Sequence, residues 1–86
     1  MPTICTFYGI LIRMFFDEHL PPHFHATYGE FQAEIVIATL EVKAGQLPRR
    51  ALALVLEWAS MHRAELLADW ELCRQRQAPG RIAPLE

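Results

Sequence analysis

The period of the hydrophobic pattern changes at Pro48, and this change constrains the fold more than any other feature of the chain. Before Pro48, apolar and polar residues alternate with a period of two, and the alternation breaks at turn residues, as in short antiparallel strands. After Pro48, Ala, Leu, Glu and Arg dominate, and neither Gly nor Pro occurs up to residue 77, which favours a helix. Pro suits the first helical position because its missing N–H would have no intrahelical partner. The sequence therefore predicts strands within residues 3–44 and helix over residues 48–77.

The first two predicted strands cover residues 3–7 and 10–16, separated by a Tyr8-Gly9 turn. Residues 10–16 are apolar on both faces, so we expect this strand to lie inside the sheet rather than at its edge. The Pro21-Pro22 pair that follows cannot lie inside a sheet and forces an extended connection.

A hairpin is predicted for residues 23–28 and 31–38, around Gly29-Glu30. Gly in the first loop position suits a type II′ turn, in which φ must be positive. Residues 41–44 can return as a last short strand. The first half of the chain therefore supplies four or five strands.

Apolar residues recur at helical spacing within residues 48–77 and form one stripe. Periodicity alone does not distinguish one long helix from two helices joined near Ser60. The Ala-Pro-Gly run at residues 78–80 ends the pattern, and we expect residues 78–86 to form a loose tail. The stripe consists of Leu52, Val55, Ala59, His62, Leu66, Trp70 and Cys73, and Leu54, Trp58 and Met61 widen it.

These elements predict a single α+β domain over residues 1–77, with a curved antiparallel sheet of four or five strands packed on one long helix or two consecutive helices. The chain has 86 residues, of which 52% are hydrophobic, a high fraction for a soluble domain. The helical stripe also carries two tryptophans, which is more apolar surface than one face of a small sheet needs. We therefore expect either a well-filled core or a surface for a partner or a homodimer, with Trp58 and Trp70 as core residues or interface anchors.

The net charge of −2, from 8 basic and 10 acidic residues, argues against nucleic acid as a ligand, because phosphate binding relies on clustered Lys and Arg. Cys5 and Cys73 are far apart in the sequence and are expected to be free, reduced thiols. Arg13 interrupts the N-terminal apolar residues, so no signal peptide is recognisable. No stretch approaches the ~20 apolar residues that span a bilayer. We therefore expect a cytoplasmic protein with no membrane segment.

Three of the four histidines lie within seven positions of the segment DEHLPPHFHATYGE, residues 17–30. His23 and His25 are two apart on a predicted strand, so they project from one face with Cβ atoms roughly 7 Å apart. Two imidazoles placed in this way can bind one metal ion, and zinc or iron would require at least one further ligand. The neighbouring candidates for that ligand are Glu30, which we place in the predicted metal site, and His19, Asp17 and Glu18.

Two alternatives to a metal site remain for the same residues. A histidine beside a carboxylate can transfer protons in RNA cleavage without a metal, so His23 and His25 are also candidate catalytic residues, with Glu30 or Asp17 as the carboxylate. Otherwise the histidines are structural and form hydrogen bonds to the backbone or to neighbouring carboxylates. His62 lies on the apolar helical stripe and is predicted to be a half-buried core residue, unless the helix packs across the histidine end of the sheet.

Motifs distributed over nearly the whole chain resemble those of a known family. They are Pro2-Thr3-Ile4, Phe7-Tyr8-Gly9-Ile10, Ile12-Arg13-Met14, Pro21-Pro22-His23-Phe24-His25, Tyr28-Gly29-Glu30, Leu47-Pro48, Arg50-Ala51-Leu52, Glu57-Trp58-Ala59, His62-Arg63, Glu65-Leu66-Leu67, Trp70, Ile82 and Pro84-Leu85-Glu86. Among these, PPHFH is the most specific. The chain resembles the bacterial family known as domain of unknown function 4160.

This resemblance implies no particular reaction, because no activity is established for the family. The genes of the family are often paired with those of another small uncharacterised protein, in an arrangement similar to toxin–antitoxin modules, which implies a small partner protein encoded nearby. One departure is visible at Leu40, where relatives tend to have the Gly of a Thr-Gly turn. Leu tolerates positive φ poorly, so Leu40 puts the tight hairpin before the last strand in doubt.

The sequence therefore favours a small cytoplasmic protein-interaction module that is one member of a toxin–antitoxin-like pair. The alternatives are a histidine-dependent ribonuclease-like toxin, with His23 and His25 as the proton-transfer groups, and a small metal-binding domain. No cofactor is expected unless the histidines bind zinc or iron. Whether the protein is an enzyme is left open by the sequence.

Overall fold

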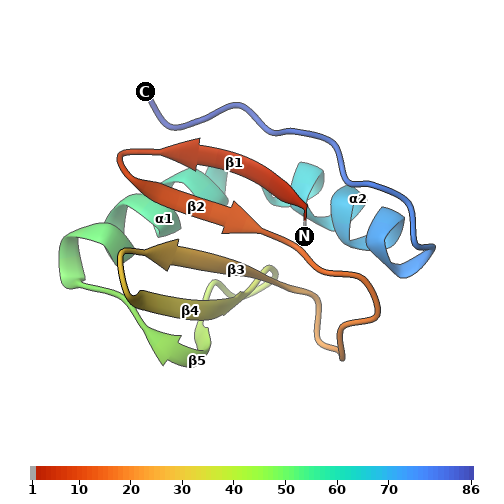
Figure 1. The fold of residues 1–86 in the computed structure, drawn as a ribbon, viewed down its shortest axis with the longest axis horizontal. Helices are drawn as coiled ribbons and strands as arrows, with labels where there is room; N and C mark the ends of the chain where they lie inside the picture. The colour runs from red at the N-terminus through yellow and green to blue at the C-terminus, as the bar shows by residue number, and fades with distance from the viewer. Residues whose placement is uncertain (1) are drawn as a thin grey trace.

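The computed structural model describes residues 2–86, which form one five-stranded antiparallel sheet and two helices (Figure 1). The strands follow one another in the sheet in chain order, so each strand pairs with its neighbours in sequence. Both helices lie on the same side of the sheet, behind it in Figure 1. The predicted α+β architecture is confirmed. The elements are β1 (Thr3–Phe7), β2 (Ile10–Arg13), β3 (His23–Tyr28), β4 (Phe31–Val36), β5 (Val42–Gln46), α1 (Arg49–Met61) and α2 (Arg63–Arg74).

Two-residue turns connect β1 to β2 and β3 to β4 and set the register of the sheet. In the β3–β4 turn, Gly29 has a φ of +60°, as predicted for the first loop position. In the β1–β2 turn, Tyr8 and Gly9 both have positive φ, 49° and 79°, which is the conformation of a type I′ turn. Primed turns match the twist of antiparallel strands, so local sequence defines both hairpins.

The β4–β5 hairpin forms despite Leu40, so the doubt raised by this residue is not justified. Leu40 adopts a φ of +62°, its N–H donates to the carbonyl of Val36 at 2.7 Å, and the Val36 N–H donates to Glu41 at 2.9 Å. A left-handed conformation costs a non-glycine residue about 1–2 kcal/mol. The Leu40 side chain packs against the core, which offsets part of that cost.

Two strands differ in length from their predicted bounds. β2 ends at Arg13 rather than at residue 16, and Phe16 is exposed instead of sharing the buried face of Ile10 and Ile12. β5 begins at Val42 and runs through Gly45 rather than stopping before it. Gly45 has a φ of +77° and pairs with Ala33, and the register shift of the β4–β5 pairing lies close by, between Ala44 and Val42. A glycine inside a strand can mark such an irregularity as well as an end.

The helical region is divided at His62, two residues after Ser60. His62 has φ −130° and ψ 25°, outside the helical range, and no side-chain hydrogen bond caps either neighbouring helix there. α2 ends at Arg74 rather than at residue 77, because Arg76 takes a φ of +60°. The Gln77 N–H then donates to Leu72 and the Arg76 N–H to Cys73, at 2.8 and 3.0 Å, which is the Schellman pattern of a helix end.

The core lies between the inner face of the sheet and the helices. Phe24, Ile12 and Ile35 from the sheet and Val55 and Trp58 from α1 are all fully buried. The predicted helical stripe is mostly buried, and it is wrong only where Met61, at the end of α1, is 59% exposed. Both cysteines are free and buried. Within residues 2–86, no helix is both long enough and apolar enough to cross a bilayer.

The C-terminal segment after α2 is not the loose tail that the sequence predicted. It runs along β1 (Figure 1), where the Ile82 N–H donates to the Ile4 carbonyl at 2.9 Å. The Trp58 indole N–H donates to the Ala83 carbonyl at 2.8 Å, and the Ile82 side chain is buried. The segment therefore covers the edge of the sheet and part of the core.

Candidate functional site

His23 and His25 lie at the start of β3, on the side of the strand opposite Phe24. Their neighbours Phe24 and Ala26 point into the core and are fully buried, which is the alternation that the sequence predicted. The two imidazole rings are 5.3 Å apart between centroids. The strand thus presents two imidazoles in contact on one face.

Glu18 completes the site from the connection between β2 and β3. Its Oε1 atom lies 2.5 Å from Nε2 of His25 and 3.4 Å from Nε2 of His23. One ligand atom from each of the three residues lies within 4.8 Å of the other two. The structure therefore brings together two imidazoles and one carboxylate, which we call the Glu18–His23–His25 cluster.

The surroundings of the two rings differ. His23 is 2% exposed, its Nδ1 atom is 2.9 Å from the Pro21 carbonyl oxygen, and its ring lies 5.3 Å from that of Trp70. His25 is less buried and meets Phe15 edge-on, with 4.5 Å between ring centroids. His23 is thus held by the fold, whereas His25 and Glu18 face the accessible side of the cluster.

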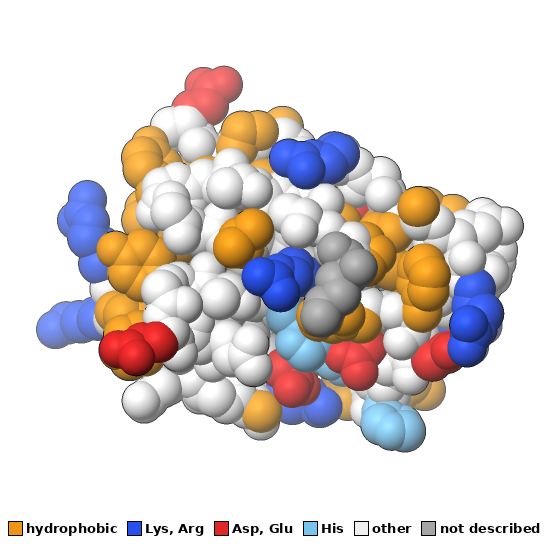
Figure 2. All heavy atoms as spheres, viewed as in Figure 1, with side chains coloured by type: hydrophobic (Ala, Val, Ile, Leu, Met, Phe, Trp, Pro, Cys, Tyr) orange, Lys and Arg blue, Asp and Glu red, His pale blue; other side chains and the backbone are white. Residues whose placement is uncertain are grey.

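A row of polar residues crosses the sheet beside the cluster. The register pairs His25 with Arg13 on β2 and with Glu34 on β4, so their side chains share the face opposite the helices. Glu34 Oε1 is 3.6 Å from Nε2 of His23 and 3.3 Å from Nζ of Lys43. Figure 2 shows histidine and carboxylate side chains gathered on this face. Within residues 2–86, Arg13 takes part in no ion pair.

The electrostatic balance of the site favours an ionised Glu18. Burial raises the pKa of the carboxyl, but the hydrogen bonds and charges of His25 and His23 outweigh burial and lower the pKa below its ordinary value. A carboxylate stabilised in this way can bind a cation or hold a protonated imidazole.

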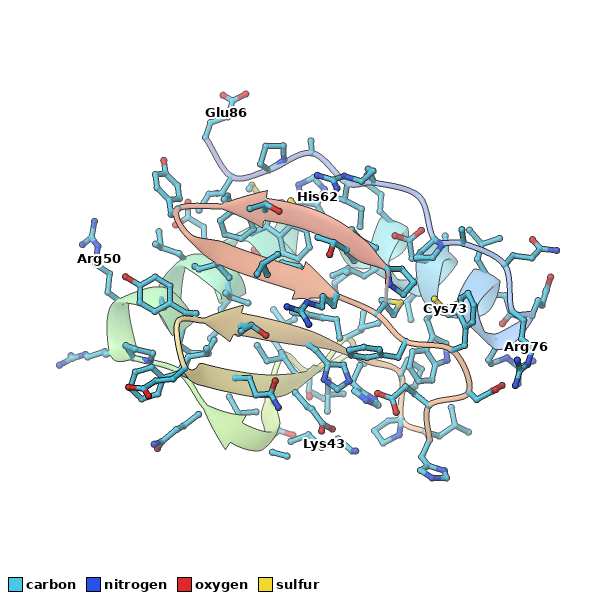
Figure 3. The ribbon with its side chains drawn as sticks, in the orientation of Figure 1. Lys43, Arg50, His62, Cys73, Arg76 and Glu86 are labelled. Carbon is cyan, nitrogen blue, oxygen red and sulfur yellow. The ribbon has the colours of Figure 1, made fainter. Side chains whose placement is uncertain are left out.

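Four other predicted site residues lie outside the cluster. Glu30 is exposed in the β3–β4 turn, at the opposite end of β3 from His23, so Glu18 takes the place predicted for it. His19 is exposed, and Asp17 forms an ion pair with Arg76. His62 lies apart, behind β1 in Figure 3.

The contacts of His62 explain its position. Its Nδ1 atom is 2.5 Å from Glu65 Oε1, and its ring lies 5.5 Å from that of Trp58. It is the half-buried residue that the sequence predicted, and among residues 2–86 it belongs to no group of potential metal ligands. Trp58 and Trp70 are 0% and 5% exposed, so both are core residues and neither offers the exposed surface that an interface anchor requires.

Sequence reasoning named Glu18 only as a neighbour of the histidines and missed Glu34 and Arg13. A signal for Glu34 was present, because a two-residue turn at Gly29-Glu30 places His25 opposite Glu34. The position of Glu18 depends on how the β2–β3 connection folds back over the sheet, which residue spacing does not determine.

Comparisons with known proteins agree with the motifs in the sequence. No curated protein and no solved structure is significantly similar to this chain. The model of a domain of unknown function, DUF4160, matches residues 9–71, which include β2 to β5, α1 and the whole Glu18–His23–His25 cluster. Because the match covers well over half of the chain, the protein belongs to the DUF4160 family.

Proposed function

We propose that this protein binds one divalent transition-metal ion, Zn²⁺ or Fe²⁺, through Glu18, His23 and His25. The observation that carries the proposal is that three potential ligand atoms lie within 4.8 Å of one another. Two imidazoles and one carboxylate form a ligand set that both ions accept. The two imidazoles come from one strand, and the carboxylate comes from the connection that precedes it and folds back toward the start of that strand.

The hydrogen bond of His23 supports a cation at the centre of the cluster. The Pro21 carbonyl can only accept, so Nδ1 of His23 carries the proton that is donated to it. In the neutral ring, Nε2 then carries a lone pair and no proton, and it faces the Glu18 and Glu34 oxygens at 3.4 and 3.6 Å. Three acceptors that face one another require a proton or a metal ion between them. Metal-bound histidines commonly donate their second ring N–H to a backbone carbonyl in this way.

Three protein ligands leave at least one coordination position for water or substrate, as in catalytic rather than structural zinc sites. A bound ion of this kind supplies Lewis acidity. Around it, Arg13 provides a cation on the same sheet face for an anionic substrate. The site is therefore compatible with hydrolysis of an anionic ester.

The proposal is tested by titrating chelator-treated protein with Zn²⁺ in a calorimeter and with Co²⁺ in a visible spectrometer. We expect one ion per chain and a melting temperature that rises with free metal by mass action. Glu18→Gln and His25→Ala should each weaken binding at least ~10-fold, since both remove a ligand. His19→Ala removes an exposed histidine outside the cluster and is the matched control. Unchanged binding in Glu18→Gln and His25→Ala would refute the proposal.

The second candidate function is metal-free acid–base catalysis on a phosphodiester, as in a ribonuclease-like toxin. The observation that favours it is the 2.5 Å contact between His25 Nε2 and Glu18 Oε1, because such a pair can transfer a proton. RNA cleavage that persists in excess chelator and disappears in His25→Ala, but not in His19→Ala, would select this candidate over a metal-dependent reaction.

We also propose, from the sequence, that the protein acts as an interaction module with a small partner in a toxin–antitoxin-like pair. A metal or acid–base site is compatible with that role. Because Trp58 and Trp70 are core residues, they cannot anchor the partner. The partner would have to bind another surface, and the pocket lined by Tyr8, Tyr28 and Arg50 is a specific candidate.

A further inference from the structure

A cavity of about 290 Å³ lies where the β1–β2 turn, the end of β3 and the first turn of α1 meet. We call it the turn-end pocket. It is lined by Tyr8, Tyr28 and Arg50 around an apolar wall that includes Ile10 and Leu54. His23 and Tyr28 are the two ends of β3, so the pocket is separated from the Glu18–His23–His25 cluster by the length of a strand. Figure 3 shows Arg50 at one end of the molecule, opposite Arg76.

The two tyrosine rings are exposed but supported. Tyr28 is 40% exposed and lies over Gly9, where an added Cβ would meet its ring at 3.5 Å. Tyr8 is 59% exposed, and its ring meets the buried Phe7 edge-on with 6.4 Å between centroids. Rings held in this way lose little conformational entropy when a ligand binds. Phe31, 38% exposed and paired with Tyr28 across the turn, extends the aromatic surface.

The charge at the pocket is positive. The first turn of α1 contains no acidic residue, and within the described part of the chain Arg50 forms no ion pair. The other polar side chains of the pocket are the tyrosine hydroxyls. Glu30 lies in the turn beyond Tyr28, so a ligand carboxylate would bind on the Arg50 side. An unpaired guanidinium beside aromatic rings is well suited to a carboxylate on an apolar ligand.

We propose that the turn-end pocket binds a peptide segment of a partner protein, with an apolar side chain of the segment in the pocket and an adjacent carboxylate on Arg50. The volume is small for a drug-sized ligand and suits one large side chain. Exposed aromatic residues with an arginine are the composition that protein interfaces favour. This proposal does not depend on a metal ion in the histidine cluster.

The test uses ¹⁵N-labelled full-length protein and the peptide acetyl-Gly-Glu-Leu-Phe-Glu-Gly-amide, with its Gln-for-Glu analogue as the neutral probe. We expect amide shifts around Tyr8, Tyr28 and Arg50, and none around His23, with an affinity of ~0.1–1 mM for a short peptide. The neutral analogue should bind at least ~10-fold more weakly, because it removes the charge that pairs with Arg50.

Arg50→Gln should weaken binding of the acidic peptide at least ~10-fold, whereas Arg49→Gln should not. Both side chains are exposed on the same helical turn, and only Arg50 lines the pocket, so the pair separates a specific contact from general charge. Equal effects of the two substitutions, shifts located elsewhere, no shifts at ~5 mM peptide, or inorganic phosphate displacing the peptide would each overturn the proposal.

Discussion

Asp69 on α2 fastens the C-terminal segment through a single oxygen: its Oδ1 accepts the Gly80 N–H at 2.8 Å, while its Oδ2 is buried without a hydrogen-bond partner among the described residues. A buried carboxylate oxygen without a partner disfavours the ionised form. Burial raises the pKa of Asp69, the Gly80 hydrogen bond opposes this shift, and the Glu65 charge adds to it. The carboxyl that anchors the segment is therefore also a source of pH-dependent stability.

Asp69→Asn should stabilise the protein more near pH 7 than near pH 4, relative to the wild type. Because the folded state holds the Asp69 proton more tightly than the unfolded chain, stability is lost as pH rises from the ordinary Asp pKa of ~3.9 through the raised folded value. Asn removes this titration and keeps an oxygen for Gly80. Urea unfolding at both pH values measures the difference. Glu71→Gln, on the exposed face of the same helix, is the control, and an equal effect of Asp69→Asn at both pH values would contradict the prediction.

Ile82→Ala should destabilise the protein by about 2–4 kcal/mol, the usual cost of truncating a buried aliphatic side chain. Ile82 is 6% exposed and its N–H donates to Ile4, so the segment after α2 belongs to the folded unit. Arg81→Ala, at the exposed neighbour, should change stability by less than ~0.5 kcal/mol. Thermal and urea unfolding of both variants test this, and a neutral Ile82→Ala would mean that the segment is the loose tail predicted from sequence.

The features that the sequence predicted well depend on local structure. The Gly29-Glu30 turn and the alternation of His23 and His25 with Phe24 follow from φ preferences and strand periodicity, which adjacent residues determine. Docking of Ile82 and the break at His62 depend on distant partners such as Ile4 and on packing of α2. An Ala-Pro-Gly run correctly ends a helix, but it does not show where the chain goes afterwards.

In the candidate site, too, the parts set by adjacent residues were predicted and the part set by tertiary structure was not. Strand periodicity predicted the two imidazoles, whereas the carboxylate was assigned to Glu30 on spacing alone. The Gly29-Glu30 pair forms the β3–β4 turn, so Glu30 lies at the opposite end of β3 from His23. The signal that predicted this turn therefore already argued against Glu30 as a partner of the histidines. Glu18 reaches the histidines only because the chain before Pro21 folds back toward the start of β3, which is a tertiary arrangement.

Gly45→Ala and Gly29→Ala should differ sharply although both glycines have positive φ, 77° and 60°. At Gly29 an added Cβ meets nothing within 4 Å, so the cost is the backbone strain of about 1–2 kcal/mol. At Gly45 the added Cβ would overlap the Gln32 carbonyl oxygen of the paired strand, so the strand pair must separate, at a total cost above ~3 kcal/mol. Unfolding free energies of the two variants test this, and comparable losses would show that β5 can move away from β4 freely.

Substitutions of Glu34 and Lys43 should change metal affinity in opposite directions if the Glu18–His23–His25 cluster binds a divalent ion. Glu34 Oε1 lies 3.6 Å from His23 Nε2 and 3.3 Å from Lys43 Nζ, so Glu34 adds negative charge beside the ligands while Lys43 neutralises part of it. Glu34→Gln should weaken Zn²⁺ binding ~10-fold, less than the loss of a direct ligand. Lys43→Gln removes a neighbouring cation and should strengthen binding severalfold, more at low than at high salt. Calorimetric titration measures both, and affinities that move in the same direction would place the ion away from Glu34.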